Sequence, residues 1–168
     1  MKGLLPANFA TAADVLAGWR DDVLSGRPPR LFPIGDGELE RLEVGPGLVN
    51  LIGGAPAAGK TAFTMQAAID ALRLTRTLRV VVCNIEMPPA VLLDRQLARL
   101  SGVDLTTIRY RRLGKRHAER IEAGLATLEE LADRLCFVRP PFDLANVAAV
   151  ADAFFAPVGD SLIVLDYI

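Results

Sequence analysis

The chain has few residues that bind metals through side-chain nitrogen or sulfur. Its 168 residues include two cysteines, Cys83 and Cys136, and one histidine. The cysteines lie far apart, each within an apolar run, so they lack the ligand spacing of a zinc site. We therefore predict no cysteine or histidine metal centre, and we interpret both cysteines as buried structural thiols in a reducing compartment.

Long hydrophobic runs and a charge excess are also missing. No apolar run approaches the roughly 18 residues of a membrane-spanning helix, and the N-terminus has no sustained apolar stretch typical of a signal peptide. We therefore expect a cytoplasmic protein. The net charge is −1, so the chain as a whole does not attract nucleic acid, and any DNA contact has to be local.

Hydrophobic residues, in contrast, are abundant. They make up 51% of the chain, and the mean hydropathy is +0.30. Such a composition excludes a disordered chain, because enough apolar surface is available for burial. The length is sufficient for one domain with a core of its own.

The most informative stretch is Gly-Ala-Pro-Ala-Ala-Gly-Lys-Thr at residues 54–61. It matches in full the phosphate-binding loop pattern G-x-x-x-x-G-K-[ST]. An apolar run at residues 48–52 precedes it and predicts a short buried parallel strand. Residues 62–72 follow it, contain neither glycine nor proline, and predict a helix. The motif therefore lies between a predicted strand and a predicted helix, as its chemistry requires.

The chemistry of this loop follows from its residue types. Gly54 and Gly59 permit backbone angles that a side chain would forbid, so loop N–H groups can turn toward phosphate oxygens. The positive end of the following helix favours the same anion. Lys60 is predicted to reach the β- and γ-phosphates and the Thr61 hydroxyl to hold Mg²⁺. The predicted nucleotide-binding residues are Gly54, Ala55, Pro56, Ala57, Ala58, Gly59, Lys60, Thr61 and Ala62.

Two carboxylates directly follow other predicted strands. Asp166 follows the apolar run 162–165, as in the Walker B motif, where the aspartate holds Mg²⁺ directly or through water. Aspartate also ends many strands simply as a turn residue. Glu86 follows the strand at residues 79–85 and has two interpretations that chemistry alone leaves open. It either orients the attacking water or is a surface acid at the start of the next helix.

The order of the predicted elements indicates an α/β fold. Strands alternate with helices, which predicts a mostly parallel sheet covered by helices on both faces. Ligands bind such sheets beyond the carboxyl ends of the strands. Residues 54–61, Glu86 and Asp166 all follow strands, and we expect them to meet at one edge. We assign residues 1–33 to an N-terminal helix, expected at 11–25 with Trp19 as a packing anchor, and a linker. We expect residues 34–168 to form the nucleotide-binding domain.

Positive charge is concentrated in one stretch. One interpretation is a DNA-facing surface. The preferred interpretation is a solvated helix start whose charge is balanced by Glu119, Glu122, Glu129 and Glu130. We expect the single histidine of the stretch to lie on the surface without a role. The stretch contains Arg109, Arg111, Arg112, Lys115, Arg116, His117 and Arg120.

Three motifs together resemble a known family. The phosphate loop with Gly53, the run Asn84-Ile-Glu-Met87 and the run Leu165-Asp-Tyr167 are similar to the RecA-like ATPase domain of DnaB-type replicative DNA helicases. The resemblance covers residues 34–168 and is most specific between Asn84 and Arg109. It implies a RecA-type P-loop NTPase that uses ATP and Mg²⁺. It also implies that Glu86 is the catalytic carboxylate and Asp166 the Walker B acid.

The resemblance further implies a homo-hexameric ring that translocates on single-stranded DNA. Two departures qualify this expectation. No counterpart of the helical collar domain precedes residue 34, and the sequence stops two residues after Asp166. The DNA-binding loops, the arginine finger and a strand beside the phosphate-loop strand lie beyond that point in the family. We expect a truncated domain that binds nucleotide, with an unfilled gap in its sheet.

Two alternative functions remain open from the sequence. One is a RecA-like ATPase that is not a helicase, such as a recombinase-like or signalling ATPase. The other is a nucleotide-binding module without catalytic activity.

Overall fold

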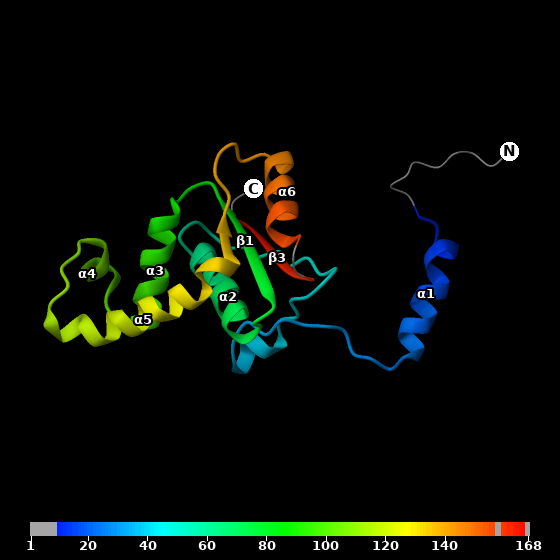
Figure 1. The fold of residues 1–168 in the computed structure, drawn as a ribbon, viewed down its shortest axis with the longest axis horizontal. Helices are drawn as coiled ribbons and strands as arrows, with labels where there is room; N and C mark the ends of the chain where they lie inside the picture. The colour runs from blue at the N-terminus through cyan, green and yellow to red at the C-terminus, as the bar shows by residue number, and fades with distance from the viewer. Residues whose placement is uncertain (1–9, 157–158, 167–168) are drawn as a thin grey trace. The chain divides into compact units, whose positions relative to one another are not determined.

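The computed structural model describes residues 10–156 and 159–166. The chain divides between Arg30 and Leu31 into two compact units (Figure 1). Among the described residues, the first unit contains α1, and the second contains the sheet and the other helices.

The first unit is built around α1 (Ala12–Leu24), which confirms the helix predicted at residues 11–25. A capping box starts it: the Thr11 N–H donates to the Asp14 carboxylate at 2.8 Å, and the Asp14 N–H donates to the Thr11 hydroxyl at 3.3 Å. The hydrogen bonds from Thr11 hold the pKa of Asp14 below its usual value. No residue of α1 is buried, and Trp19 is exposed. The expected packing role of Trp19 is therefore wrong within this unit.

The sheet of the second unit has three parallel strands in the order β2-β1-β3. The central strand is β1 (Leu78–Asn84), flanked by β2 (Leu135–Phe137) and β3 (Asp160–Asp166). In the register, Val82 lies opposite both Phe137 and Val164. Buried apolar residues fill β1 because helices cover both of its faces.

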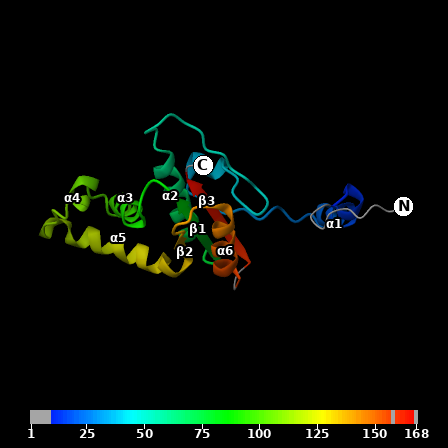
Figure 2. The ribbon, with the colours of Figure 1, turned by 90° about the horizontal axis from the view of Figure 1, so that it is seen from above.

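Alternate residues of β1 contribute to different cores. Leu78, Val80 and Val82 join a cluster with α2 (Lys60–Leu74), whereas Val81 and Cys83 join a cluster with α6 (Leu144–Phe155). Figures 1 and 2 show α2 and α6 on opposite sides of the sheet. The predicted α/β class, with a parallel sheet between helical layers, is confirmed for these strands.

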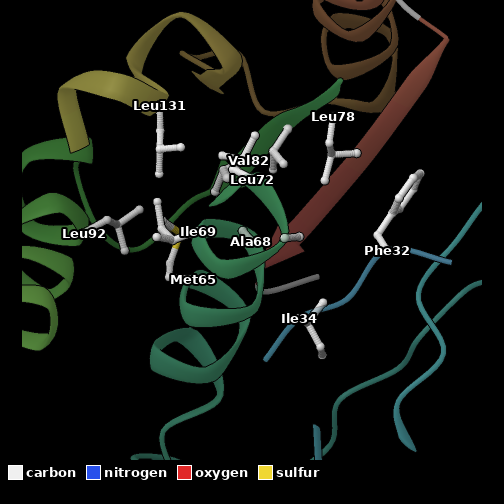
Figure 3. Packing of buried hydrophobic residues seen from close by; sticks show 12 residues of the cluster. Phe32, Ile34, Met65, Ala68, Ile69, Leu72, Leu78, Val82, Leu92 and Leu131 are labelled. Atoms are coloured by element: carbon white, nitrogen blue, oxygen red, sulfur yellow. The ribbon is translucent and has the colours of Figure 1, made fainter. Parts of the chain in front are cut away.

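The larger cluster connects α2, β1 and the approach segment. Figure 3 shows Leu72 of α2 near Val82 of β1 within this cluster. Phe32 and Ile34 belong to it as well, and the Phe32 N–H donates to the Val44 carbonyl at 2.6 Å. This segment also includes the short 3-10 helix η1 (Gly37–Arg41).

The two cysteines pack where the sequence predicts. Both are free thiols; Cys83 is buried and Cys136 is half-buried. They lie among the apolar residues that face α6. Burial raises the pKa of both thiols, because the thiolate loses solvation. The interpretation as structural thiols fits this environment.

A helical subdomain follows β1. The helix α3 (Pro89–Ser101) starts at a proline and ends at Gly102, whose φ of 63° is left-handed. Asp104 caps α4 (Leu105–Arg109). Residues 115–134 form the 3-10 helix η2 (Lys115–His117), α5 (Ala118–Leu131) and the 3-10 helix η3 (Ala132–Arg134). His117 is 8% exposed, so its expected surface position is wrong.

The predicted strand at residues 48–52 is not present. No strand is assigned there, and Val49 and Leu51 are each 96% exposed. A strand requires hydrogen-bonded neighbours, and none of the described strands pairs with this run. The apolar composition indicated burial correctly for β1, whereas in β3 Leu162 and Val164 are half-buried and Ile163 and Leu165 are exposed. The composition could not indicate whether a pairing partner was present.

Candidate functional site

Helix α2 brings the start of the phosphate-loop motif to the carboxyl end of the sheet. It packs along β1, and only residues 75–77 connect the two elements, so they run antiparallel. A helix of 15 residues and a strand of 7 residues each span about 23 Å. Lys60 at the start of α2 is therefore level with Asn84 at the end of β1. Figure 1 shows the start of α2 near the end of the sheet where β3 finishes.

The loop before α2 contains two residues with a left-handed backbone. Gly59 is the N-cap with φ of 90°, a conformation that favours glycine. Ala57 is also left-handed at 62°, whereas Gly54 is not. No side chain caps the helix, and its first backbone bond runs from the Phe63 N–H to the Gly59 carbonyl at 2.9 Å. The three preceding N–H groups, of residues 60–62, have no acceptor within the helix and carry its positive dipole end.

The Lys60 ammonium is directed back into its own loop. Its Nζ donates to the carbonyl oxygens of Gly54 at 2.9 Å and Ala55 at 3.1 Å. A phosphate oxygen carries the opposite charge and is a stronger acceptor for an ammonium than a neutral carbonyl is. The Lys60 ammonium is therefore held by two neutral carbonyl acceptors of its own loop.

A second part of the site is formed by the ends of β1 and β3. Asn84 and Asp166 are register partners, and the Asn84 amide donates to the Asp166 carboxylate. The Asn84 side-chain oxygen accepts the Met87 N–H at 2.7 Å. One buried amide thus holds both the Asp166 carboxylate and the turn that carries Glu86.

Glu86 lies two residues beyond β1, at the same edge of the sheet, with an exposed side chain. In the part of the chain that the structure describes, no hydrogen bond or ion pair connects Lys60, Thr61, Glu86 and Asp166 to one another. The fold thus brings three segments to one edge, but it does not bring these four side chains into contact.

Sequence reasoning assigned no role to Asn84. Asparagine has both a donor and an acceptor, so it can connect two neighbouring segments at the end of a strand. The available signal was a polar residue closing a buried apolar strand, one position before the Ile-Glu-Met run.

The donor set suits magnesium with phosphate rather than a metal held by protein alone. Among the described residues, no group of three His, Cys, Asp or Glu side chains is close enough to hold an ion. Mg²⁺ in nucleotide sites typically has one or two protein ligands, with phosphate and water oxygens completing the shell. The two ligands predicted from the sequence, Thr61 and Asp166, match that number, and their role stays a prediction because no interaction joins their side chains in the described residues.

A hollow of about 550 Å³ lies away from this loop, and its lining contains none of the predicted nucleotide-binding residues. Residues of α2 such as Gln66, Asp70 and Arg73 line it together with Thr127 and Glu130 of α5.

Within the described ranges, no helix is long and apolar enough to cross a membrane.

The chain matches a known protein family over most of its length. The sequence pattern of the DnaB-like helicase C terminal domain matches residues 39–168, a range that contains the phosphate loop, Asn84, Glu86 and Asp166. The search of curated proteins found no match to the chain.

Proposed function

The chain belongs to the family of DnaB-like helicase C-terminal domains, and on this basis we propose that it binds ATP with Mg²⁺ at residues 54–62. Membership implies helicase and ATPase function for the family in general, with interaction with single-stranded DNA and hexamer formation. Our proposal for this chain is that its nucleotide site belongs to such a cytoplasmic motor, in which ATP hydrolysis is coupled to translocation on single-stranded DNA.

The observation that supports nucleotide binding best is the start of α2. Three N–H groups without helical acceptors, the Lys60 ammonium and the helix dipole all favour an anion at the same point. In the proposal, the β- and γ-phosphates replace the Gly54 and Ala55 carbonyls as acceptors of the Lys60 ammonium. The small side chains of residues 54–59 leave the backbone accessible to the phosphates.

Magnesium would be held by Thr61 and Asp166 together with phosphate oxygens. The ion would supply charge neutralisation on the phosphates as the terminal phosphate is transferred to water. Asn84 keeps Asp166 oriented through its amide, and the same residue anchors the turn before Met87. Glu86, at the end of that turn, is proposed to accept a proton from the attacking water.

The test is nucleotide binding by Lys60→Ala. Binding of a fluorescent ATP analogue with Mg²⁺ is expected to become unmeasurable, a loss of about 30-fold or more, because a charged partner of the phosphates is removed. Arg76→Ala removes an exposed cation from another part of the chain and is expected to bind as the original protein does. Unchanged affinity in Lys60→Ala would exclude the proposed site.

A further inference from the structure

The second unit carries a concentrated basic surface that the nucleotide site does not use. We call residues 109–120, which run from the end of α4 through η2 into α5, the basic patch. Six of its twelve residues are Lys or Arg and one is Glu, a net charge of +5 in a chain whose net charge is −1. Figures 1 and 2 both show α4 and the start of α5 extending away from the sheet. The cations are Arg109, Arg111, Arg112, Lys115, Arg116 and Arg120.

The local fold presents these cations to solvent. All six are exposed, because the turn after α4 is held by other groups. Arg111 has a left-handed φ of 56°, and the Arg112 N–H donates to the Thr107 carbonyl at 2.9 Å. The buried His117 ring accepts the Gly114 N–H at 3.1 Å. Apolar burial of Ile108 and Ile121 fixes the two helices that flank the turn.

Acidic side chains do not neutralise the patch. Arg111 pairs with Asp94 at 2.8 Å, and within the described ranges no other cation of the patch forms an ion pair. Glu129 lies nine residues after Arg120 along α5, about 14 Å away, which exceeds the screening length of about 8 Å at physiological salt. Of the other glutamates that the sequence suggested, Glu119 lies inside the patch and Glu122 lies two residues beyond it. Counting both, residues 109–122 keep a net charge of +4, so the balance is only partial.

An exposed aromatic ring lies among the cations. Tyr110 is 59% exposed, and the guanidinium carbons of Arg109 and Arg112 lie 5.9 Å and 5.3 Å from its ring centroid. An aromatic ring surrounded by cations suits a single-stranded nucleic acid, whose bases stack on the ring while its phosphates meet the cations. An acidic peptide would use the charge but not the ring.

We propose that the basic patch binds single-stranded nucleic acid, with a base stacked on Tyr110 and phosphates contacted by Arg109, Arg112 and Lys115. The patch is separate from residues 54–62, so this binding requires no nucleotide at the phosphate loop. The two sites can therefore be tested independently on the same protein.

The charge contribution is tested with the triple variant Arg109→Gln, Arg112→Gln, Lys115→Gln. Binding of labelled oligo-dT and oligo-rU of about 16 nucleotides is measured by fluorescence anisotropy across a salt series, without ATP. Each lost phosphate contact lowers the slope of log K against log salt by about 0.7, so the triple variant is expected to lose about 2 from that slope. The control variant Arg20→Gln, Arg76→Gln, Arg139→Gln removes the same charge from exposed positions elsewhere and should keep the original slope.

The stacking contribution is tested at Tyr110. Tyr110→Leu is expected to weaken binding about 5- to 100-fold, whereas Tyr110→Phe keeps the ring and should bind normally.

Preference for one oligonucleotide over the other identifies DNA or RNA as the ligand and supports the proposal in either case. The proposal is overturned if neither oligonucleotide binds, if the control variant loses as much as the triple variant, or if duplex binds equally well without dependence on Tyr110. The Lys60→Ala variant should keep this binding, so failure at either site leaves the other proposal standing.

Discussion

At the scale of single residues, substitution of Glu86 should distinguish ATP binding from ATP hydrolysis. The proposed role predicts that Glu86→Gln keeps affinity for ATP, because the side chain is exposed and is not proposed to touch the phosphates. Hydrolysis should fall by about 10²-fold or more, because the amide cannot accept the proton from water. Phosphate release and analogue binding are measured together. The control is Glu119→Gln, which replaces an exposed acid in the basic patch and should change neither hydrolysis nor ATP affinity. Normal turnover by Glu86→Gln would show that Glu86 is not the catalytic carboxylate.

A second residue-scale prediction concerns stability. The Asp70 carboxylate accepts two hydrogen bonds from Arg99, at 2.9 Å and 3.0 Å, and one from Arg73 at 3.2 Å. Asp70→Ala leaves the half-buried Arg99 without its carboxylate partner, although its bond to Gln96 remains, and should lower the free energy of unfolding by about 2 kcal/mol. Glu38→Ala breaks an exposed pair with Arg41 and should cost less than about 1 kcal/mol. Urea unfolding measures both, and equal effects would contradict the importance of the Asp70 network.

These residues also show what the sequence could reveal. The phosphate-loop residues are contiguous, so their pattern was readable directly. The contact of Asp70 with Arg99 spans 29 positions, and that of Asn84 with Asp166 spans 82. Contacts of this kind depend on strand register and helix packing, which no local pattern encodes.

At the scale of elements, the approach of α3 to α5 depends on Gly124. A Cβ there would lie 2.9 Å from Leu97 Cδ1 and 3.3 Å from Ser101 Cβ. Overpacking costs about 1–3 kcal/mol, whereas replacing a helical glycine gains about 1 kcal/mol. We therefore expect Gly124→Ala to destabilise the protein by about 1 kcal/mol.

The matched control is Gly18→Ala in α1, where nothing lies within 4 Å of the added Cβ. The same exchange should there gain helix stability of about 1 kcal/mol, seen as stronger helical circular dichroism. A stabilising effect of Gly124→Ala in urea unfolding would contradict the close packing of α3 against α5.

Several helices have start or stop signals that lie within a few residues of their ends in the sequence. The α3 helix begins at a proline and ends at glycine, and α4 and α6 follow capping aspartates, Asp104 and Asp143. The run at 48–52 is largely apolar, as the buried strand β1 is, yet its side chains are exposed. A strand depends on its neighbours, and its formation therefore could not be decided from the run alone.

At the scale of the whole molecule, the exposed run at 48–52 and the outer edge of β3 raise a question of solubility. No described strand pairs with that edge of β3, and Val49 and Leu51 are almost fully exposed. Exposed apolar side chains and unpaired strand edges both promote association between molecules. We therefore expect the protein to aggregate through these features at high concentration.

The double variant Val49→Ser, Leu51→Ser tests this arrangement against the buried strand that the sequence suggested. If both side chains are exposed, the free energy of unfolding should change by less than about 0.5 kcal/mol, and light scattering at high concentration should fall. If they are buried in a sheet, each substitution should cost about 2 kcal/mol or more. Val81→Ser, in the buried centre of β1, provides the reference for a buried site. A loss in the double variant comparable to that of Val81→Ser would mean that residues 48–52 form a paired, buried strand in solution.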